Sequence, residues 1–145
     1  MLKAYRYRLY PTGSQRRAMN QTLEECRWLY NRLLEERKLA WEVGGAGISL
    51  YDQHKRLPLL KTERTSLDRV HSQVLQNVAL RIDLAFKAFF RRVRAGEEPG
   101  YPRFRGLGRY DSFCYPQAPS GCQVRGARLH LSKVGSVRIV LHRLL

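Results

Sequence analysis

The longest run of periodic apolar residues in the chain extends from His71 to about Ala95. Its apolar positions recur every three or four residues, namely Leu75, Val78, Ala79, Ile82, Phe86, Phe89 and Val93. This spacing predicts an amphipathic α-helix whose apolar face packs against a core. Gly96 and then Pro99 predict its end, because glycine readily adopts the left-handed conformation that closes helices and proline cannot continue them.

The polar residues of this helix differ between its two ends. Its first turns carry uncharged hydrogen-bonding side chains, namely Ser72, Gln73, Gln76 and Asn77. Its last turns carry cations, namely Lys87, Arg91, Arg92 and Arg94. Cations there suit the negative end of the helix dipole. One interpretation is that the amide end reads bases and the arginine end holds phosphates. The other is a core helix with a solvated polar face, which this stretch alone favours.

A second long helix is predicted near the start of the chain. Thr12 and Gln15 form the pattern of a capping box, in which each side chain bonds the backbone amide of the other residue. The periodic apolar residues that follow carry the helix to about Val43. A break near Thr22 is an open alternative, which would give a short helix and then a long one.

A shorter helix is predicted between the two long ones. Ser49 caps it, and it runs from Leu50 to about Leu57, where Pro58 stops or kinks it. An irregular link follows, with one more turn around residues 65–68.

Alternating residues predict strands at both ends of the chain. Residues 2–10 alternate, with aromatic side chains on one face and Arg6 and Arg8 on the other. The later strands are expected at residues 110–115, 123–124, 128–131 and 136–142. This order predicts an α+β fold, in which a helical insertion splits a β-barrel-like domain after its first strand.

The loop between the last helix and the later strands interleaves aromatic residues with arginines. These residues are Tyr101, Arg103, Phe104 and Arg105. Such a loop could stack bases and hold the phosphate backbone of a nucleic acid. Equally, Tyr101 and Phe104 could pin the loop to the core.

The composition and net charge indicate a folded domain with a polyanionic binding partner. The 145 residues are 43% apolar, which predicts a folded domain with a core. The net charge of +15 points to a polyanion, most simply nucleic acid, with an anionic membrane surface as the weaker alternative. The excess is uneven, because residues 81–109 carry a net +5 and residues 18–45 a net −1. No apolar run is long enough to cross a bilayer, and no signal peptide is found.

The three cysteines are Cys26, Cys114 and Cys122. Their odd number and the lack of a C-x-x-C pair predict free thiols in a reducing cytoplasm. A zinc site formed by Cys114, Cys122, His130 and His142 is the weaker alternative, because its spacing matches no common site.

Catalytic patterns are missing from the sequence. The acidic residues are scattered over helix faces and loops, whereas a metal-dependent nuclease needs several convergent carboxylates. The chain contains no P-loop, no G-x-S-x-G and no H-E-x-x-H motif. Catalysis by this chain alone is therefore not expected.

Several stretches together resemble the N-terminal part of TnpB proteins. These are RNA-guided nucleases carried by bacterial insertion sequences and related to the type V CRISPR effectors. The stretches are residues 5–15, 28–31, 75–77, 101–105 and 129–135. They occur in the family's order and with family-like spacing over nearly the whole chain. The five stretches together are therefore more specific evidence than any one of them alone.

The resemblance implies an oligonucleotide-binding-like β-barrel, the wedge domain, interrupted by a helical recognition domain. Residues 1–11 would supply the first strand, residues 12–96 the helical insertion and residues 97–145 the remaining strands. A helix-turn-helix label would attach to about residues 12–45. That region is nearly neutral, whereas a recognition helix in the major groove should be basic or amide-rich.

The resemblance also implies roles for individual residues. The chain would hold guide RNA and read a short motif beside the DNA target, while base pairing reads the rest. The motif-reading residues would be Leu50, His54, Ser72, Gln73, Gln76 and Asn77. Gln76 with Asn77 fits the family pattern, and such amides can pair bidentately with adenine. With the charge pattern, RNA and phosphate binding falls to Arg6, Arg8, Lys87, Arg91, Arg92, Arg94, Tyr101, Arg103, Phe104 and Arg105.

Length is the main departure from the family. The family's catalytic domain, with three acidic residues, and its four-cysteine zinc element normally follow the point where this chain ends. We therefore expect no nuclease activity and no cofactor in this chain, with Mg²⁺ and Zn²⁺ belonging only to the missing part. The expected partners are guide RNA and target DNA, with a separate nuclease-domain chain as a further candidate. The expected location is the bacterial or archaeal cytoplasm.

Three alternatives stay open at this point. The chain could be a stand-alone DNA-binding regulator that uses residues 12–43 and needs no RNA. It could be an inert remnant of a decayed gene whose barrel is incomplete. An enzyme in its own right would need a carboxylate cluster that the sequence does not offer.

Overall fold

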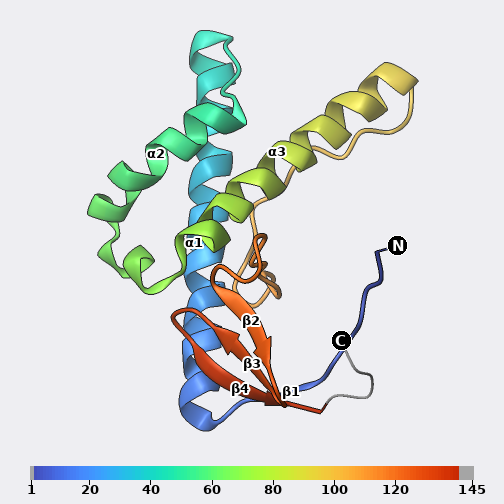
Figure 1. Cartoon of the computed structure of the whole chain (residues 1–145). Helices are drawn as coiled ribbons and strands as arrows, with labels where there is room; N and C mark the ends of the chain where they lie inside the picture. The colour runs from blue at the N-terminus through green and yellow to red at the C-terminus, as the bar shows by residue number, and fades with distance from the viewer. Residues whose placement is uncertain (1, 141–145) are drawn as a thin grey trace.

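The computed structural model describes residues 2–140 and shows a helical bundle built on one long helix, with a small sheet beside the start of that helix (Figure 1). In chain order the elements are β1 (Leu9–Tyr10), α1 (Gly13–Gly44), α2 (Leu50–Glu63), the 3₁₀ helix η1 (Thr65–Arg69), α3 (Ser72–Ala95), β2 (Cys122–Arg125), β3 (Arg128–Leu131) and β4 (Gly135–Ile139).

The four strands form one antiparallel sheet in the order β1-β4-β3-β2. Leu9 pairs with Ile139 and Tyr10 with Arg138, so the strand that precedes the helices joins the last of the strands that follow them. The α+β class is therefore confirmed. The closed oligonucleotide-binding-like barrel goes beyond this four-stranded sheet and stays a prediction.

Two of the predicted strands are wrong in extent or existence. The first contains only Leu9 and Tyr10, because its partner β4 ends at Ile139 within the described residues. Residues 110–115 form no strand. Their side chains serve other contacts: Tyr110 is buried, and the Tyr115 hydroxyl donates to the carbonyl oxygen of Ser132 at 2.8 Å. The predicted end of the last strand, residues 141–142, lies outside the described residues.

The first long helix is continuous, so the alternative of a break near Thr22 is wrong. Thr22 is buried, and its hydroxyl donates to the carbonyl oxygen of Ala18 at 2.9 Å, which satisfies the polar group inside the helix. The capping box is confirmed. The Gln15 amide donates to the Thr12 hydroxyl at 3.2 Å, and the Thr12 amide donates to the Gln15 side-chain oxygen at 3.0 Å.

The prediction that Pro58 ends the second helix is also wrong, because α2 continues to Glu63. Proline lacks the amide that would bond the preceding turn, which weakens a helix interior. Leu57 and Leu60, on either side of Pro58, are both buried in the core. Their burial favours the helix and outweighs the lost bond. The cap at Ser49 is confirmed.

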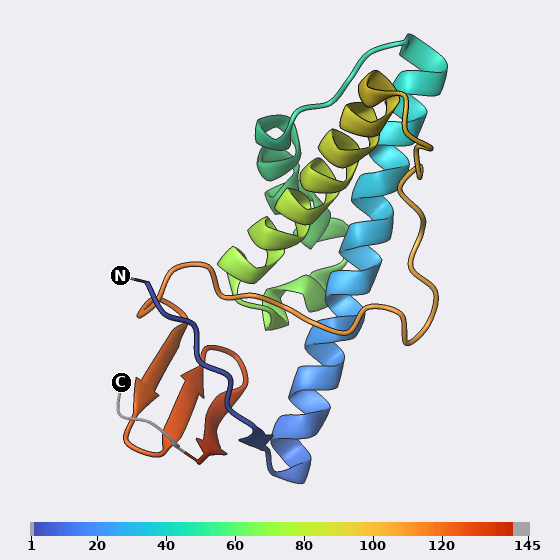
Figure 2. The same cartoon turned by 90° about the vertical axis from the view of Figure 1, so that its right-hand side faces the viewer.

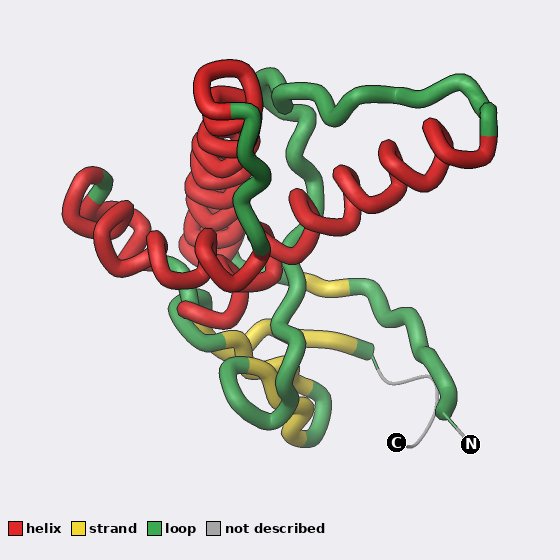
Figure 3. Tube along the Cα trace, turned by 90° about the horizontal axis from the view of Figure 1, so that it is seen from above, coloured by secondary structure: helices red, strands yellow, loops and turns green. Residues whose placement is uncertain are grey.

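The core lies where α1, α2, η1 and α3 meet. Figures 2 and 3 show α3 crossing α1, and the segment between α3 and β2 running back along α1 to the sheet. One polar chain joins the three helices. The Arg37 guanidinium donates to the side-chain oxygen of the fully buried Gln53 at 2.8 Å and to Asp83 at 3.0 Å.

Candidate nucleic-acid interface

The acidic side chains of the helices are largely engaged in ion pairs within the protein. The pairs are Glu24–Arg27, Glu25–Arg64, Glu36–Arg32, Glu36–Arg56, Glu63–Arg32, Asp83–Arg37 and Asp83–Lys87. In the part of the chain that the structure describes, the arginines of the last turns of α3 have no such partner, and neither do Glu97 and Glu98 just after them. One group of cations without an ion pair therefore lies toward the end of α3 and in the loop that follows, where residues 81–109 carry a net +5.

An exposed ridge runs the length of α3, which we call the α3 ridge. Its members recur every three or four residues and are all exposed, namely Ser72, Gln76, Leu80, Leu84, Lys87, Arg91 and Arg94. At 1.5 Å per residue the ridge is about 33 Å long. The amide end and the arginine end predicted from the sequence thus share one face of the helix.

The amide end of the ridge meets α2. A ring nitrogen of His54 lies 3.3 Å from the carbonyl oxygen of Gln76, so these two predicted reading residues come together. Ser72 and Gln76 are exposed, and Asn77 is half-buried on the neighbouring stripe. Leu50, one turn before His54, is partly buried and packs against the core.

Gln73 points to a different partner. Its side-chain nitrogen donates to the Gln117 side-chain oxygen at 3.0 Å, and its own side-chain oxygen is buried without a hydrogen-bond partner among the described residues. The neighbouring His71 ring packs against Tyr115, with ring centroids 5.6 Å apart. Gln73 is therefore turned to the returning segment more than to solvent.

The arginine end of the ridge is open. Arg91 and Arg94 are exposed, and Arg92 is half-buried beside them. Lys87 is held by Asp83, with its amine 2.9 Å from the carboxylate. Burial tends to raise the pKa of Asp83, but the hydrogen bonds and charges of Lys87 and Arg37 outweigh it and lower that pKa.

Of the loop aromatics, Tyr101 packs on α3. Its ring meets Phe86 and Phe89 edge to face, with centroid distances of 5.6 and 5.3 Å. Tyr101 thus pins the loop to the helix, as one of the two sequence interpretations had it. Phe104 remains half-exposed, with the Lys38 amine 5.9 Å from its ring centroid, and Arg103 is exposed.

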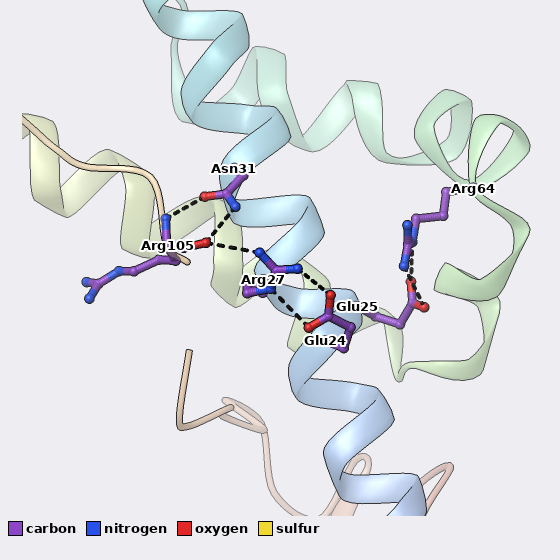
Figure 4. A network of polar contacts seen from close by, with 6 residues as sticks. All are labelled: Glu24, Glu25, Arg27, Asn31, Arg64 and Arg105. Carbon is purple, nitrogen blue, oxygen red and sulfur yellow. Dashed lines mark hydrogen bonds and ion pairs between the residues drawn. The ribbon is translucent and has the colours of Figure 1, made fainter. Parts of the chain in front are cut away.

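Arg105 is clamped to α1 through its backbone. Its amide donates to the Asn31 side-chain oxygen at 2.7 Å, and its carbonyl accepts from the Asn31 side-chain nitrogen at 2.9 Å and from Arg27 at 3.1 Å (Figure 4). Two of the stretches that resemble TnpB proteins, residues 28–31 and 101–105, therefore meet here. Arg27 is itself held by Glu24.

Arg6 and Arg8 are exposed on the segment before β1. The Arg8 guanidinium lies 5.9 Å from the centroid of the Tyr10 ring. Figure 1 shows this segment running outward from β1, apart from the arginine end of α3. The structure therefore separates these two arginines from the α3 ridge.

Sequence reasoning missed Arg81 and Arg109. They line a cavity of about 430 Å³ together with Arg105. The sequence could have indicated Arg81, because it lies four residues after Asn77 and therefore on the same face of the helix. This face adjoins the ridge, since Arg81 directly follows the ridge residue Leu80. Arg109 gave none, since only the folded loop brings it to the helix.

The structure also bears on metal sites and membranes. Within residues 2–140, no three His, Cys, Asp or Glu side chains gather in a way that could hold a metal ion. His142, part of the alternative zinc site, lies outside the described residues. Cys26 is buried, and burial raises the pKa of its thiol to about 12. No helix in the described range is both long and apolar enough to cross a membrane.

Comparison with known proteins gives two kinds of match. Residues 1–46 match the model of a helix-turn-helix domain family. The chain is 32% identical over 139 residues to the "Putative RNA-guided DNA endonuclease InsQ" of Escherichia coli (strain K12), covering 94% of this chain and 33% of that protein. It is 31% identical over 105 residues to a "Putative RNA-guided DNA endonuclease" of Streptomyces pristinaespiralis, covering 71% and 25% of the two chains.

The chain thus spans about a third or less of the length of these curated relatives. Within residues 2–46, as the structure describes them, α1 is the one helix. A helix-turn-helix unit needs two helices joined by a short turn, so the second helix of any such pair would have to be α2.

Proposed function

The chain is related to the TnpB family of RNA-guided DNA endonucleases, and we propose that it is a nucleic-acid-binding module of such a transposon-encoded protein. In this proposal the module holds guide RNA and reads a short DNA motif beside the target. The names of the relatives support RNA and DNA as the two partners. We assign the chain binding and not cleavage, because most carboxylates of its helices are engaged in ion pairs.

The observation that carries this proposal is the α3 ridge. The arginines at its end make no ion pair among the described residues, whereas Glu24, Glu25 and Glu36 of α1 are engaged by arginines of α1, α2 and the link to η1. Unpaired surface cations are what a phosphate backbone needs, because each contact releases condensed counterions. Exposed amides on the same ridge can then meet base edges of the same ligand.

Base reading is assigned to the amide end. Gln76 is exposed at the point where α2 reaches α3, and a Gln side chain can bond the two edge groups of adenine. His54, Ser72 and Asn77 surround this position. Leu50 and Gln73 take supporting roles, since both pack against other parts of the protein.

Phosphate binding is assigned to the arginine end and to the loop beside it. The cations that would bond phosphates are Lys87, Arg91, Arg92, Arg94, Arg103 and Arg105. The loop aromatics belong to the same RNA-binding set, in which Phe104 would stack on a base and Tyr101 holds the loop on α3. Arg6 and Arg8 form a second basic area beside the sheet, which would meet a different part of the same RNA.

The direct test is to purify the 145-residue chain from its own host, elute its bound nucleic acid with salt, and sequence that nucleic acid. A discrete RNA that maps beside its own gene supports the proposal. Random RNA, or no nucleic acid at all, contradicts it. The proposal also predicts that the chain prefers structured RNA to random duplex DNA.

Motif reading needs a separate test. DNA duplexes with a randomised segment are selected by the chain bound to its own RNA, and the selection is repeated with Gln76→Ala. Loss of one bidentate pair should cost about 1–3 kcal/mol of discrimination at one base position. The matched control is Gln123→Ala in β2, which should leave the selected motif unchanged. If Gln76→Ala selects the same motif with the same preference, Gln76 does not read bases.

A further inference from the structure

A cavity of about 430 Å³ lies between the middle of α3 and the loop that returns from it. Its lining comes from three places in the chain: Tyr30 of α1; Arg81, Leu84 and Ala85 of α3; and Arg105 with residues 109–112 of the loop. Among the lining residues are the arginines Arg81, Arg105 and Arg109 and a single acid, Asp111. In the described part of the chain, none of these four makes an ion pair.

The guanidinium of Arg81 is fixed in this cavity. One of its terminal nitrogens, Nη1, donates to the Tyr110 hydroxyl at 3.1 Å and to the carbonyl oxygen of Ser112 at 2.8 Å. The guanidinium also lies 5.3 Å from the centroid of the Tyr110 ring. Both bonds use Nη1, so Nη2 and Nε are left to bond a ligand.

The loop arginines are positioned by the backbone. The clamp by Asn31 holds the backbone of Arg105 (Figure 4). The Arg105 guanidinium lies 5.4 Å from the centroid of the Tyr30 ring. The Arg109 amide donates to the carbonyl oxygen of Gly106 at 3.0 Å, and Gly108 has φ +74°. This is the geometry of a type II turn, whose third position requires a positive φ.

The chemistry of the cavity selects its ligand. The guanidinium groups of Arg81 and Arg105 cover the rings of Tyr110 and Tyr30, so these ring faces are not open for a base to stack on. The cavity instead offers N–H groups as hydrogen-bond donors. Fixed guanidinium forks match the oxygens of a phosphate, which they bond bidentately. Three arginines against one carboxylate also leave the cavity positive.

We propose that this cavity binds a backbone phosphate of the nucleic acid that lies along the α3 ridge. The inference rests on the proposed function, and it names a contact that the ridge alone does not supply. Arg81 lies between Leu80 and Ile82, beside the apolar middle of the ridge. A phosphate held there fixes the position of the backbone between the amide end and the arginine end.

The test measures the affinity of the full chain for a short RNA hairpin over a series of salt concentrations. The pocket variants are Arg81→Gln and Arg109→Gln, and the matched control is Arg125→Gln, an exposed arginine of β2. Each pocket variant should weaken binding about 3- to 10-fold and make the slope of log K against log salt shallower by about 0.7–0.9, the loss of one phosphate contact. Arg125→Gln should change the affinity less than 2-fold, roughly the effect of removing one remote charge. The thermal midpoints of all three variants are measured, to separate unfolding from loss of contact.

Asn31→Ala tests the positioning of Arg105. It removes the clamp and leaves all cations in place, so its affinity should fall although its charge is unchanged. If the hairpin binds the wild type and the pocket variants behave like Arg125→Gln, the pocket inference is wrong and the proposed function stands. If the wild type does not bind the hairpin, both are wrong.

A parallel calorimetric titration uses inorganic phosphate, because a free phosphate offers the same oxygens. Loss of both phosphate and hairpin affinity in Arg109→Gln supports a backbone phosphate as the ligand. Loss of phosphate binding with unchanged hairpin affinity shows that the cavity takes the free ion, and this overturns the inference.

Discussion

At the scale of residues, a few polar side chains each join two elements. Gln15 closes the capping box of α1, and its side-chain nitrogen also donates to the carbonyl oxygen of Ser136 in β4 at 2.7 Å. Asn31 holds the loop at Arg105, and Arg37 joins Gln53 to Asp83. The sequence predicted the local role of Gln15 as a cap. It could not predict the remote role of any of the three, because each depends on a partner that folding brings near.

Asp83→Asn should destabilise the protein by about 3 kcal/mol, because it leaves the buried Arg37 without its carboxylate. The free energy of unfolding in urea is the measurement. Glu24→Gln is the control, since its carboxylate is half-exposed and exposed pairs contribute little. A cost for Asp83→Asn no larger than that for Glu24→Gln would contradict the role given to the polar chain.

The same aspartate predicts a pH dependence. Its pKa is lowered from the ordinary value of 3.8 in the folded state, so its contribution is complete above that pH and is lost as the pH falls below it. The stability difference between the wild type and Asp83→Asn should therefore shrink below pH 3.8. A difference that stays constant down to low pH would show that Asp83 is not the titrating group.

Gly121→Ala should destabilise the junction between the loop and α3. A Cβ there would lie 2.5 Å from the His71 ring, and the residue has φ +78°. Gly126→Ala is the matched control, because it shares the positive φ of +58° but has nothing within 4 Å. The control should cost about 1–2 kcal/mol for its backbone alone, and Gly121→Ala about 1–3 kcal/mol more for the clash. Equal thermal midpoints for the two variants would contradict the packing of His71.

At the scale of elements, the helix propensity of a single residue and the packing of its neighbours disagree in two places. A break near Thr22 was an open alternative, and Pro58 was expected to stop or kink the second helix, yet α1 and α2 run through these residues. In each case buried neighbours on the same helix face fix the helical backbone. The long helix α3 shows the opposite case, because its period and its end at Gly96 were predicted from the sequence and confirmed. Its predicted core face is buried from Leu75 to Phe86, but Val93 is exposed, because the helix has passed beyond the core there.

Pro58→Ala should stabilise the protein by about 1–3 kcal/mol, because it restores a helical hydrogen bond and removes the clash of the ring with the preceding turn. Leu59→Ala, at the neighbouring exposed position, serves as the control and should change little. Chemical denaturation measures both. A destabilised Pro58→Ala would mean that the proline has a packing role that outweighs its cost to the helix.

The candidate site was predictable to the extent that it lies on one element. The spacing of Gln76, Lys87 and Arg91 placed them on a single helix, and the structure shows them on one exposed ridge. The cavity was not predictable, because Arg81 and Arg109 belong to different elements. The strand predicted at residues 110–115 also prevented the prediction of this cavity. In a regular strand, successive side chains point to opposite faces, so Tyr110, Asp111 and Ser112 would not line the same cavity.

At the scale of the whole molecule, the distribution of charge separates structure from binding. Glu24, Glu25 and Glu36 of α1 are bonded by arginines of α1, α2 and the link to η1, and the pairs to α2 and to the link join the helices. Arg91 and Arg94 of α3 and the arginines of the returning loop are exposed and lie outside this network. Residues 81–109, which include most of α3 and the returning loop, carry a net +5 of the total charge of +15, and most of their arginines make no ion pair among the described residues.

The measurement that tests the central claim most directly is the salt dependence of RNA-hairpin affinity for the wild type and a ridge variant. The ridge variant changes the two ridge arginines and their neighbour, as Arg91→Gln/Arg92→Gln/Arg94→Gln. The control removes the same charge from β2, β3 and the turn before β4, with Arg125→Gln/Arg128→Gln/Lys133→Gln. The α3 ridge predicts that the first triple variant makes the slope of log K against log salt shallower by about 2–3, while the control keeps most of the wild-type slope. Equal losses in the two variants, or an unchanged slope in the ridge variant, would contradict the assignment of α3 as the nucleic-acid interface.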